Sequence, residues 1–510
     1  MGDRRVNAAE KKPGGGFALF GLALGLATGL SLYAIGEYWL DKVADKAMAG
    51  TVLCAVACFS AAFLLLAERG AILRAIPAAA LIAALLAAPT YFMLRAATPS
   101  TGLAHFPSTF WFFLGGPLAA YLLTTLAKAS LLTKAPPPYD AVFFHGLTLP
   151  LIAGGAKFFA GLAVVLLFAW AMLLKSMEVG FFHDLFRKPW FLLPFIGAIG
   201  GLSIAMMRGL ETVLGALRFI LLLFCRIAMP ITAVFSLTFI AVLAVKGPTA
   251  IFVGPTPGGI MLALAFAGML IFNGVYQNGQ GGPPPLWLRL ATIVSLAAFP
   301  VYAGLAAYAL GLRIHEYGLT PARVIGAAMN ALAALYSIVC LAGLLTEINW
   351  RGARWMPLVA PLNTAMAAAW IIALIALATP LADPWTLSAK SQERLLMSGK
   401  ADPASFDFAY LHEQLGVEGD AALKRLKALP GDDPRAAAIR EGAEKALAGA
   451  PNDRAYTLDP ESGEVTFGDG VEGARPPTGD SPETLPLNPY RSSPGEDGND
   501  PAPSDGEDPD

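Results

Sequence analysis

Long uncharged runs alternate with short polar connections from the start of the chain to Thr379. A window of about nineteen residues, the length of a helix that crosses a bilayer, predicts eleven such spans. They lie near residues 17–36, 47–67, 71–94, 109–132, 150–174, 189–208, 221–245, 257–277, 288–311, 322–345 and 356–379. We therefore expect an all-α, polytopic bundle of membrane helices.

Two apolar stretches, residues 141–174 and 211–245, are longer than one span needs and too short for two spans with a turn. We interpret each as an amphipathic lead-in at the interface followed by one crossing, with Lys157 and Arg218 reaching back to the boundary. If Lys157 instead lies deep in the bilayer, it becomes a candidate functional residue, because buried charges in membranes usually have a role.

The connections carry more Lys and Arg on the side of the N-terminus than on the opposite side. The positive-inside rule therefore predicts a cytoplasmic N-terminus. Because the number of spans is odd, the C-terminal tail is expected on the other side of the membrane. The lipid bilayer is the partner that the composition predicts first.

Composition divides the chain near Pro380. Overall, 55% of the residues are hydrophobic and 15% charged, with a formal net charge of −2. Residues 1–379 carry 24 Lys and Arg against 12 Asp and Glu, whereas residues 380–510 carry 12 against 26. We expect two environments in one chain, and an acidic tail that is suited to a basic protein partner. Nothing in the pattern indicates nucleic-acid binding.

We divide the chain accordingly into five regions. The regions are a basic leader (1–16), four membrane spans (17–139), the remaining spans (140–379), a small helical region after the membrane (380–429) and a disordered acidic tail (430–510). The tail is assigned from its richness in Pro, Gly, Asp, Glu and Ser.

Helical patterns recur in the region after the membrane. In SAKSQERLLMSG, Ser388 is expected as the N-cap and Gly399 as the C-terminal stop. The next segment places Phe406, Tyr410 and Leu411 on one stripe. A third helix is expected to present the leucines of DAALKRLKAL, namely Leu423, Leu426 and Leu429. Together these helices predict a small cap on the membrane surface.

Small residues form ridges in two predicted spans. Gly21, Gly25 and Gly29 recur every four residues, and Gly197 and Gly201 repeat the spacing. Such ridges let two helices approach closely, either inside one bundle or between two copies of the chain. We favour packing inside the bundle, because a protein with many spans offers many internal partners.

Candidate chemistry in the spans is sparse. Glu178, Glu211 and Glu347 fall at span ends, and the four cysteines lie inside apolar runs without metal-ligand spacing. P-loop, GxSxG, HExxH and zinc-binding patterns do not occur in the sequence. We expect no metal and no cofactor. Because buried carboxylates usually serve as relays in proton-coupled and cation-coupled carriers, their scarcity argues against that class.

One acidic loop keeps an enzymatic alternative open. EYWLDKVADK follows the first span and supplies Glu37, Asp41 and Asp45. Membrane glycosyltransferases that use lipid-linked substrates carry an acidic pair in a similar place. The alternative is therefore an enzyme at the outer face, although charges in a connector this short are usually only solvated.

RIHEYGLTPAR, residues 313–323, is the most polar short run between two strongly apolar stretches. Gly318 suits the end of one helix, Thr320 the N-cap of the next, and Pro321 its first residue. Arg313, Glu316, Tyr317 and Arg323 then remain as a candidate binding or docking set, tested by whether they face the helices after the membrane or the lipid.

This run also takes part in a resemblance. YALGLRIHEYGLTPARV, FNGVYQNGQGGPPPLWLR before it and LSAKSQERLLMSGKADPASFDFAYLHEQLG after it resemble the bacterial inner-membrane family catalogued as domain of unknown function 4153. The similarity runs from about Asp140 to about Leu429, and His315 is not part of it. It implies a many-helix fold in a bacterial cytoplasmic membrane. It implies no reaction.

The sequence favours a protein without catalytic activity. Span number and helix-breaking prolines, such as Pro150 and Pro230, favour a permease-like transporter of unknown substrate. The scarcity of buried ionisable groups and the acidic tail favour an envelope protein that binds another protein. The outer-face enzyme is the third hypothesis.

Overall fold

The computed structural model describes residues 15–40, 42–43, 45–68, 71–96, 106–131, 137–247, 257–348, 354–431, 433–449, 456–458 and 465–467. Its helices are α2 (Gly15–Tyr38), α3 (Lys46–Leu66), α4 (Ile72–Ala96), α5 (Phe106–Phe110), the π-helix η1 (Trp111–Gly115), α6 (Gly116–Ser130), α7 (Tyr139–Ser176), α8 (Phe181–Phe186), α9 (Pro189–Met207), α10 (Glu211–Lys246), α11 (Pro257–Tyr276), α12 (Leu286–Tyr317), α13 (Pro321–Ile348), α14 (Val359–Leu377), α15 (Pro384–Met397), α16 (Phe408–Lys427) and α17 (Pro434–Leu447). Strands β1 (Tyr456–Leu458) and β2 (Val465–Phe467) pair antiparallel.

The predicted number of spans is confirmed. Within the described residues, 11 helices are long and apolar enough to cross a membrane. They are α2, α3, α4, the continuous run from α5 to α6, α7, and α9 to α14. The short helix α8 joins the fifth span to the sixth. The chain is therefore an all-α, multi-pass membrane protein, as the apolar runs predict.

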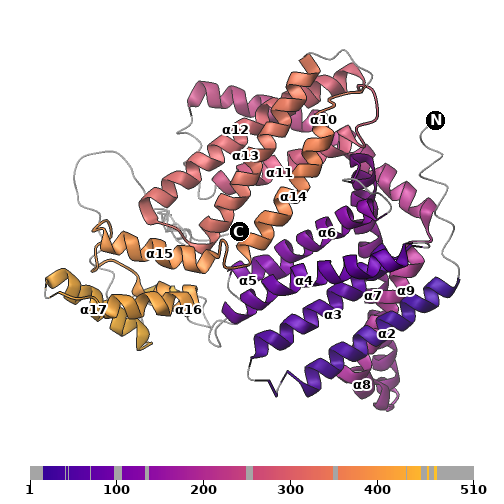
Figure 1. Cartoon of the computed structure of the whole chain (residues 1–510), viewed down its shortest axis with the longest axis horizontal. Coiled ribbons are helices and arrows are strands. Elements are labelled where there is room, and N and C mark those ends of the chain that lie inside the picture. The colour runs from indigo at the N-terminus through magenta and orange to yellow at the C-terminus, as the bar shows by residue number, and fades with distance from the viewer. Residues whose placement is uncertain are drawn as a thin grey trace, which may run out of the picture.

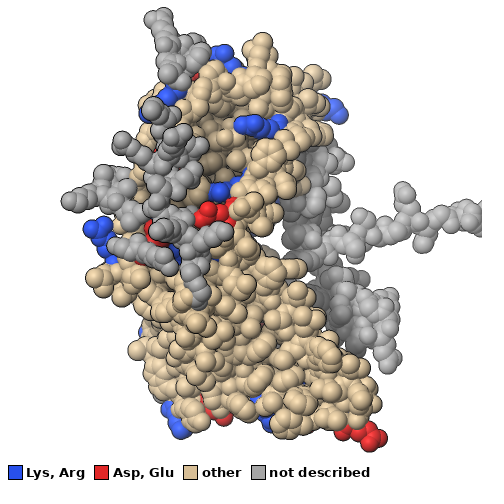
Figure 2. Space-filling view, turned by 90° about the vertical axis from the view of Figure 1, so that its right-hand side faces the viewer, with Lys and Arg blue, Asp and Glu red and all other residues tan. Residues whose placement is uncertain are grey.

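Apolar side chains cover the outside of this bundle as well as its interior. Phe158, Trp170, Phe219, Phe235 and Val245 are among the large apolar side chains that remain exposed. Figure 2 shows a broad surface without charged side chains, with Lys, Arg, Asp and Glu concentrated beyond its edges. Such a surface is stable against lipid and would be costly in water, which explains why the spans show little amphipathic pattern.

The spans form two groups (Figure 1). The first contains α2, α3, α4 and α9, with α2 packed on α9 and on α3, and α3 packed on α4. The second contains α10 to α14, in which α12 packs on α10, α11 and α13. Helix α6 lies between the groups, because it contacts α3 and α4 on one side and α14 on the other.

The two long helices do more than cross the bilayer. The predicted lead-ins are not separate from their crossings, because α7 has 38 residues and α10 has 36, each as one helix. At about 1.5 Å per residue each exceeds 50 Å, whereas a hydrocarbon core is about 30 Å thick. Proline lies inside both helices, Pro150 in α7 and Pro230 in α10.

The first halves of α7 and α10 run between the two helix groups. The first residue of α7, Tyr139, contacts α11 and α14. Sixteen positions later, Gly155 packs against Met207, the last residue of α9. Helix α10 runs in the opposite direction, back toward the second helix group. Its Leu214 packs beside Met207, and its Cys225 packs against Gly274 of α11. The two first halves touch where Arg218 donates to the Thr148 hydroxyl at 3.2 Å. We call them the connecting segments, residues 139–155 and 211–225.

Lys157 and Arg218, the two cations predicted at the membrane interface, lie in or next to the connecting segments. Lys157 is exposed and follows Gly155, the point at which α7 passes the end of α9. Arg218 is half-buried, with its guanidinium 4.4 Å from the centre of the Phe144 ring. Lys157 therefore lies beside the end of α9, and Arg218 lies where the two connecting segments touch.

Helices α15, α16 and α17 form a compact unit at one end of the bundle (Figure 1). Helix α16 packs on α15 and on α17, and Leu411, Leu415, Leu423 and Leu426 are fully buried between them. Gly416 interrupts α16 with φ +54°, a conformation that glycine adopts at little cost. We call this unit the end cap.

Four predictions about the end cap need correction. Asp383, not Ser388, caps α15, because its carboxylate accepts from the amides of Trp385 and Thr386. Phe406 lies before α16, which Asp407 caps. Leu429 likewise follows the last residue of its helix.

The fourth correction concerns the acidic tail. The predicted disorder from residue 430 is wrong for 434–447, where α17 forms and buries Ile439 and Ala443. Alanines on one stripe supply enough apolar surface for this packing despite the polar composition. Within 430–510 the structure describes residues 430–431, 433–449 and the two strands. For the rest of the tail, disorder stays a prediction.

Candidate functional site

The polar run between α12 and α13 forms the predicted capped turn. Gly318 ends α12 with φ +70°, and the Thr320 hydroxyl accepts from the Arg323 amide at 3.3 Å at the start of α13. Arg323 also donates to the Gly318 carbonyl at 2.7 Å, with its guanidinium 5.6 Å from the centre of the Tyr317 ring. The structure therefore brings Arg323 and Tyr317 together, at the turn itself.

The turn faces the end cap through its backbone. Gln392 of α15 donates to the carbonyls of Tyr317 and Leu319 at 3.0 and 2.9 Å, and the Ser391 hydroxyl accepts from the Leu319 amide at 2.9 Å. Lys400 donates to the carbonyl of His315. Backbone groups that end a helix need such partners, so these side chains fix α15 on the turn.

Of the four predicted docking residues, two are half-buried and two are exposed. Arg323 is half-buried near Tyr410 of α16. Burial raises the pKa of Tyr410 to about 12, and the positive charge of Arg323 partly offsets that rise by lowering the pKa. Glu316 and Tyr317 have exposed side chains, and Arg313 is half-buried. Arg323 lies between the turn and Tyr410 of the end cap, as the docking hypothesis requires.

The two glycine ridges pack against each other inside the chain. Gly21, Gly25 and Gly29 of α2 lie directly against α9 at Gly201, Gly197 and Leu193. A Cβ built on Gly21 would lie 2.6 Å from the Gly201 carbonyl oxygen. The backbones therefore approach so closely that one added carbon has no room, and this face of α2 is occupied by α9.

Two of the three carboxylates in the acidic loop after the first span, Glu37 and Asp45, lie in the described part of the chain. Asp45 caps α3 by accepting from the amides of Ala47 and Met48, and it accepts from the Tyr91 hydroxyl at 3.2 Å. Glu37 lies in the last turn of α2. Asp41 falls outside the described residues. Asp45 thus has a structural role that explains its presence.

A polar cluster that the sequence analysis missed lies where the connecting segment of α7 meets the second helix group. Asn363 of α14 donates to Asn273 of α11 at 2.6 Å and to the Tyr139 hydroxyl at 3.2 Å. Asn273 donates to the Tyr336 hydroxyl of α13 at 3.0 Å. We call these four residues the amide–phenol cluster. It joins four helices inside the membrane region.

The depth of the cluster follows from the helix ends. Asn273 lies three residues before the end of α11, and Asn363 lies four residues after the start of α14. Each is thus about one helical turn inside its helix. Tyr336 is fully buried, and Asn273 also donates to the carbonyl of Met269.

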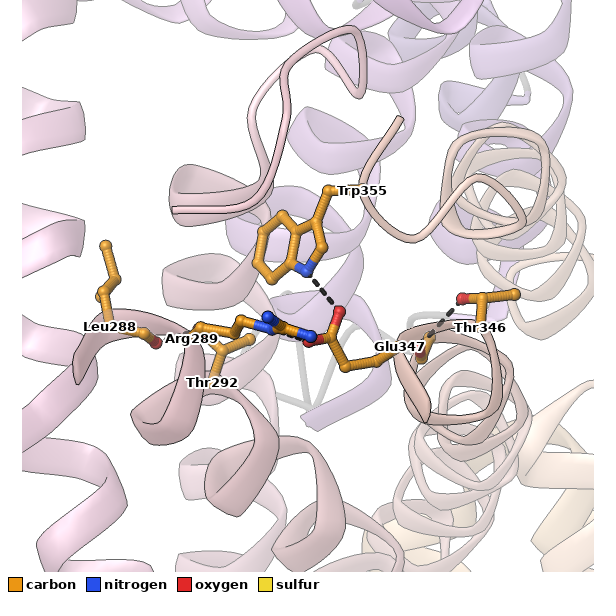
Figure 3. A network of polar contacts seen from close by, with 7 residues as sticks. Leu288, Arg289, Thr292, Thr346, Glu347 and Trp355 are labelled. Carbon is orange, nitrogen blue, oxygen red and sulfur yellow. Dashed lines mark hydrogen bonds and ion pairs between the residues drawn. The ribbon is translucent and has the colours of Figure 1, made fainter. Parts of the chain in front are cut away.

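An ion pair closes the bundle just outside the cluster (Figure 3). Arg289, in the first turn of α12, pairs with Glu347, near the end of α13. The Trp355 indole N–H donates to the other Glu347 oxygen at 2.7 Å. Arg289 and Trp355 point toward Glu347 from different segments, and Glu347 is only 5% exposed.

Aromatic rings connect this ion pair with the cluster. The ring of Tyr276, at the end of α11, lies 6.0 Å from that of Trp355 and 5.9 Å from that of Tyr139. The Tyr276 hydroxyl donates to the Met356 carbonyl at 3.0 Å. Polar and aromatic side chains therefore form one continuous path from the ion pair to Tyr336.

The chemistry available to this arrangement is hydrogen bonding. Amides and phenols can hold an uncharged or zwitterionic polar group, but they supply no strong nucleophile or base. Among the described residues no three His, Cys, Asp or Glu side chains lie close enough to hold a metal ion. The one buried carboxylate at the path, Glu347, is already engaged by Arg289 and Trp355.

The sequence carried a signal for the cluster. Asn273 and Asn363 are amides inside apolar runs, where polar side chains are costly unless they find partners. Asn273, Tyr276 and Arg289 also belong to FNGVYQNGQGGPPPLWLR, one of the segments behind the family resemblance. The two amides are easily overlooked in the sequence, because carboxylates and histidines are the usual relay residues in membrane spans.

Comparison with models of protein families, with curated proteins and with solved structures found no match.

Proposed function

We propose that this chain is a permease-like transporter of the bacterial inner membrane and that it has no catalytic activity. The observation that carries the proposal is the amide–phenol cluster. It lies at the junction of α7 with α11, α13 and α14, where the connecting segment joins the two helix groups. Movement of one group against the other would change access to these four side chains, as alternating access requires.

The chemistry of the cluster limits the substrate class. Asn273, Asn363 and the two phenols are uncharged, so they suit a solute with hydroxyl, amide or zwitterionic groups. A proton-coupled carrier needs a titratable relay in the spans. Glu347 pairs with Arg289 at a helix end and is poorly placed for that role. We therefore propose facilitated passage, without proton coupling.

Family membership and topology are part of the proposal. The turn at Gly318 and the segment around Ser391 and Gln392 carry much of the resemblance to the family of unknown function, and they bond directly to each other. Cations also gather at one end of the first helix group. Arg208 donates to Leu64 and Lys128 to Leu66, both at the end of α3. This clustering supports a cytoplasmic N-terminus and an end cap on the periplasmic side.

The end cap supports a second candidate, an envelope protein that binds another protein. Three helices are held on the α12–α13 turn, where a partner outside the membrane would reach them. The acidic residues after 468, which lie outside the described part, would contribute charge to a basic partner. In this case the amide–phenol cluster serves only to pack helices.

Solute entry into proteoliposomes tests the transport proposal. Purified protein is reconstituted and swelling is followed with a panel of sugars, polyols and zwitterionic amino acids. We expect entry of at least one solute class, and loss of that entry in Asn273→Leu and Asn363→Leu. Asn330→Leu is the matched control, because Asn330 is a buried amide of α13 that bonds to Ala303 away from the cluster. Wild-type vesicles indistinguishable from empty ones across the panel would refute the proposal.

A further inference from the structure

Residues 354–358, between α13 and α14, close the bundle over the amide–phenol cluster. Trp355 is 3% exposed and Met356 is fully buried, although neither belongs to a helix. The Trp355 amide donates to the Gly281 carbonyl at 3.2 Å, and the Met356 carbonyl accepts from Tyr276. These bonds fasten the segment to the end of α11 and to the connection that follows it. We call residues 354–358 the plug.

The plug is held in an unfavourable backbone conformation. Met356 has φ +44°, in the left-handed region that residues other than glycine rarely adopt. Such a residue persists only where its surroundings fix it, and strain of this kind concentrates at segments that switch. Release of the plug would relieve this strain.

One ion pair fixes the plug in place. Glu347 pairs with Arg289 through one carboxylate oxygen and accepts the Trp355 indole N–H through the other. The side chain therefore joins α12, α13 and the plug at one point (Figure 3). Removal of Arg289 would leave the Glu347 carboxylate, whose side chain is 3% exposed, without its ion-pair partner, which strongly destabilises the closed arrangement.

The plug lies directly outside the proposed substrate contacts. The Tyr276 ring lies next to both Trp355 and Tyr139, with centroid distances of 6.0 and 5.9 Å. A solute that leaves the cluster along these rings displaces Tyr276 and Trp355. The plug thus covers the side of the cluster that the proposed topology makes cytoplasmic.

We infer that the plug is the cytoplasmic gate of the path and that the Glu347–Arg289 pair is its latch. The inference rests on the proposed function and adds the means by which access to the cluster is controlled. In the closed state the pair and the indole bond hold Trp355 over Tyr276. Opening breaks both contacts, relaxes Met356 and exposes the amide–phenol cluster to the cytoplasm.

Cysteine accessibility tests the gate without a known substrate. Cys54, Cys58, Cys225 and Cys340 are replaced by Ala, and Asn363→Cys supplies a single thiol in the cluster. Inverted membrane vesicles are labelled with a membrane-impermeant maleimide. We expect slow labelling with the latch intact and labelling roughly tenfold faster with Glu347→Gln, which keeps an acceptor for Trp355 but removes the charge that binds Arg289.

A matched ion pair in the other helix group supplies the control. Glu68→Gln breaks the pair with Lys128, which lies at the end of α3 in the other helix group. Its labelling should equal that of the parent. Arg289→Gln should act like Glu347→Gln, and the double variant should label more slowly than Arg289→Gln, because the buried Glu347 carboxylate that lost its cation is gone.

The outcomes separate the gate from the proposed transport. Equal labelling rates in the parent, Glu347→Gln and Arg289→Gln, with unchanged thermal melting, would overturn the gate even if solute enters proteoliposomes. Faster labelling in both latch variants without solute entry would support a moving plug and leave transport refuted. Faster labelling with Glu68→Gln as well would show general loosening of the bundle, and would overturn the assignment of the latch.

Discussion

Replacement of Gly21 by alanine probes the close contact between α2 and α9. The added Cβ would lie 2.6 Å from the Gly201 carbonyl oxygen and 2.9 Å from the Ala205 Cβ. Ordinary contact begins near 3.4 Å, so the two backbones would have to separate by about 0.8 Å at this point. Helices α2 and α9 cannot separate at one residue alone, because Gly25 and Gly29 form the same kind of contact further along.

The size of the effect follows from two opposing terms. Overpacking in a close contact costs about 1–3 kcal/mol. Alanine is favoured over glycine inside a helix by about 1 kcal/mol. Gly200, on α9 beside the ridge, has nothing within 4 Å of a built Cβ. Its replacement by alanine would therefore bring the gain in helix propensity without the cost of overpacking. We therefore expect Gly21→Ala to be about 1–3 kcal/mol less stable than Gly200→Ala.

Equilibrium unfolding in mixed micelles of detergent and SDS measures this difference, with tryptophan fluorescence as the signal. Gly36→Ala is a second control in α2, because its built Cβ also meets nothing within 4 Å. If Gly21→Ala unfolds at the same SDS fraction as Gly200→Ala, the close packing of α2 on α9 is refuted. A change from monomer to dimer between these variants would instead assign the ridge to an intermolecular contact.

Three further predictions concern the end cap and its attachment. Gln392→Leu should release α15 from the turn, because it removes the donor to the Tyr317 and Leu319 carbonyls, at a cost of about 1–3 kcal/mol. Proteolysis of the end cap should then be faster than in Lys390→Ala, a control at an exposed residue. Arg323→Ala should destabilise the turn, whereas Glu316→Ala should not, and equal melting temperatures for the two variants would contradict the assignment. Tyr410 has its pKa raised from 10.0 to about 12, so its contribution to stability is complete below pH 10 and is lost as pH rises through 12. Tyr410→Phe should remove that part of the alkaline loss, and identical alkaline unfolding of wild type and variant would contradict it.

The spans were predictable because the bilayer sets their length and composition. The eleven predicted runs match the eleven helices, since a backbone in lipid has to satisfy its hydrogen bonds within the helix. The turn at Gly318 was predictable for another local reason, because glycine, threonine and proline each occupy the position their backbone preference favours. Local rules of this kind operate without knowledge of tertiary contacts.

The connecting segments and the amide–phenol cluster depend on tertiary contacts. Nothing in the apolar pattern of α7 indicates that its first half reaches from α11 to the end of α9. Asn363 and Tyr139 are separated by 224 positions, so their hydrogen bond is invisible to any window along the chain. Ser388 and Asp383 show a third limit, because both residue types cap helices and packing decides which of them does so.

Access to the amide–phenol cluster from the two sides of the membrane tests the central claim most directly. A single cysteine at position 363 is labelled by an impermeant maleimide in spheroplasts, which expose the periplasmic side, and in inverted vesicles, which expose the cytoplasmic side. A permease-like transporter predicts labelling from both sides, at rates that respond in opposite directions to Glu347→Gln. Labelling from neither side, in a protein that still melts like wild type, would show that the cluster only packs helices and would contradict the account.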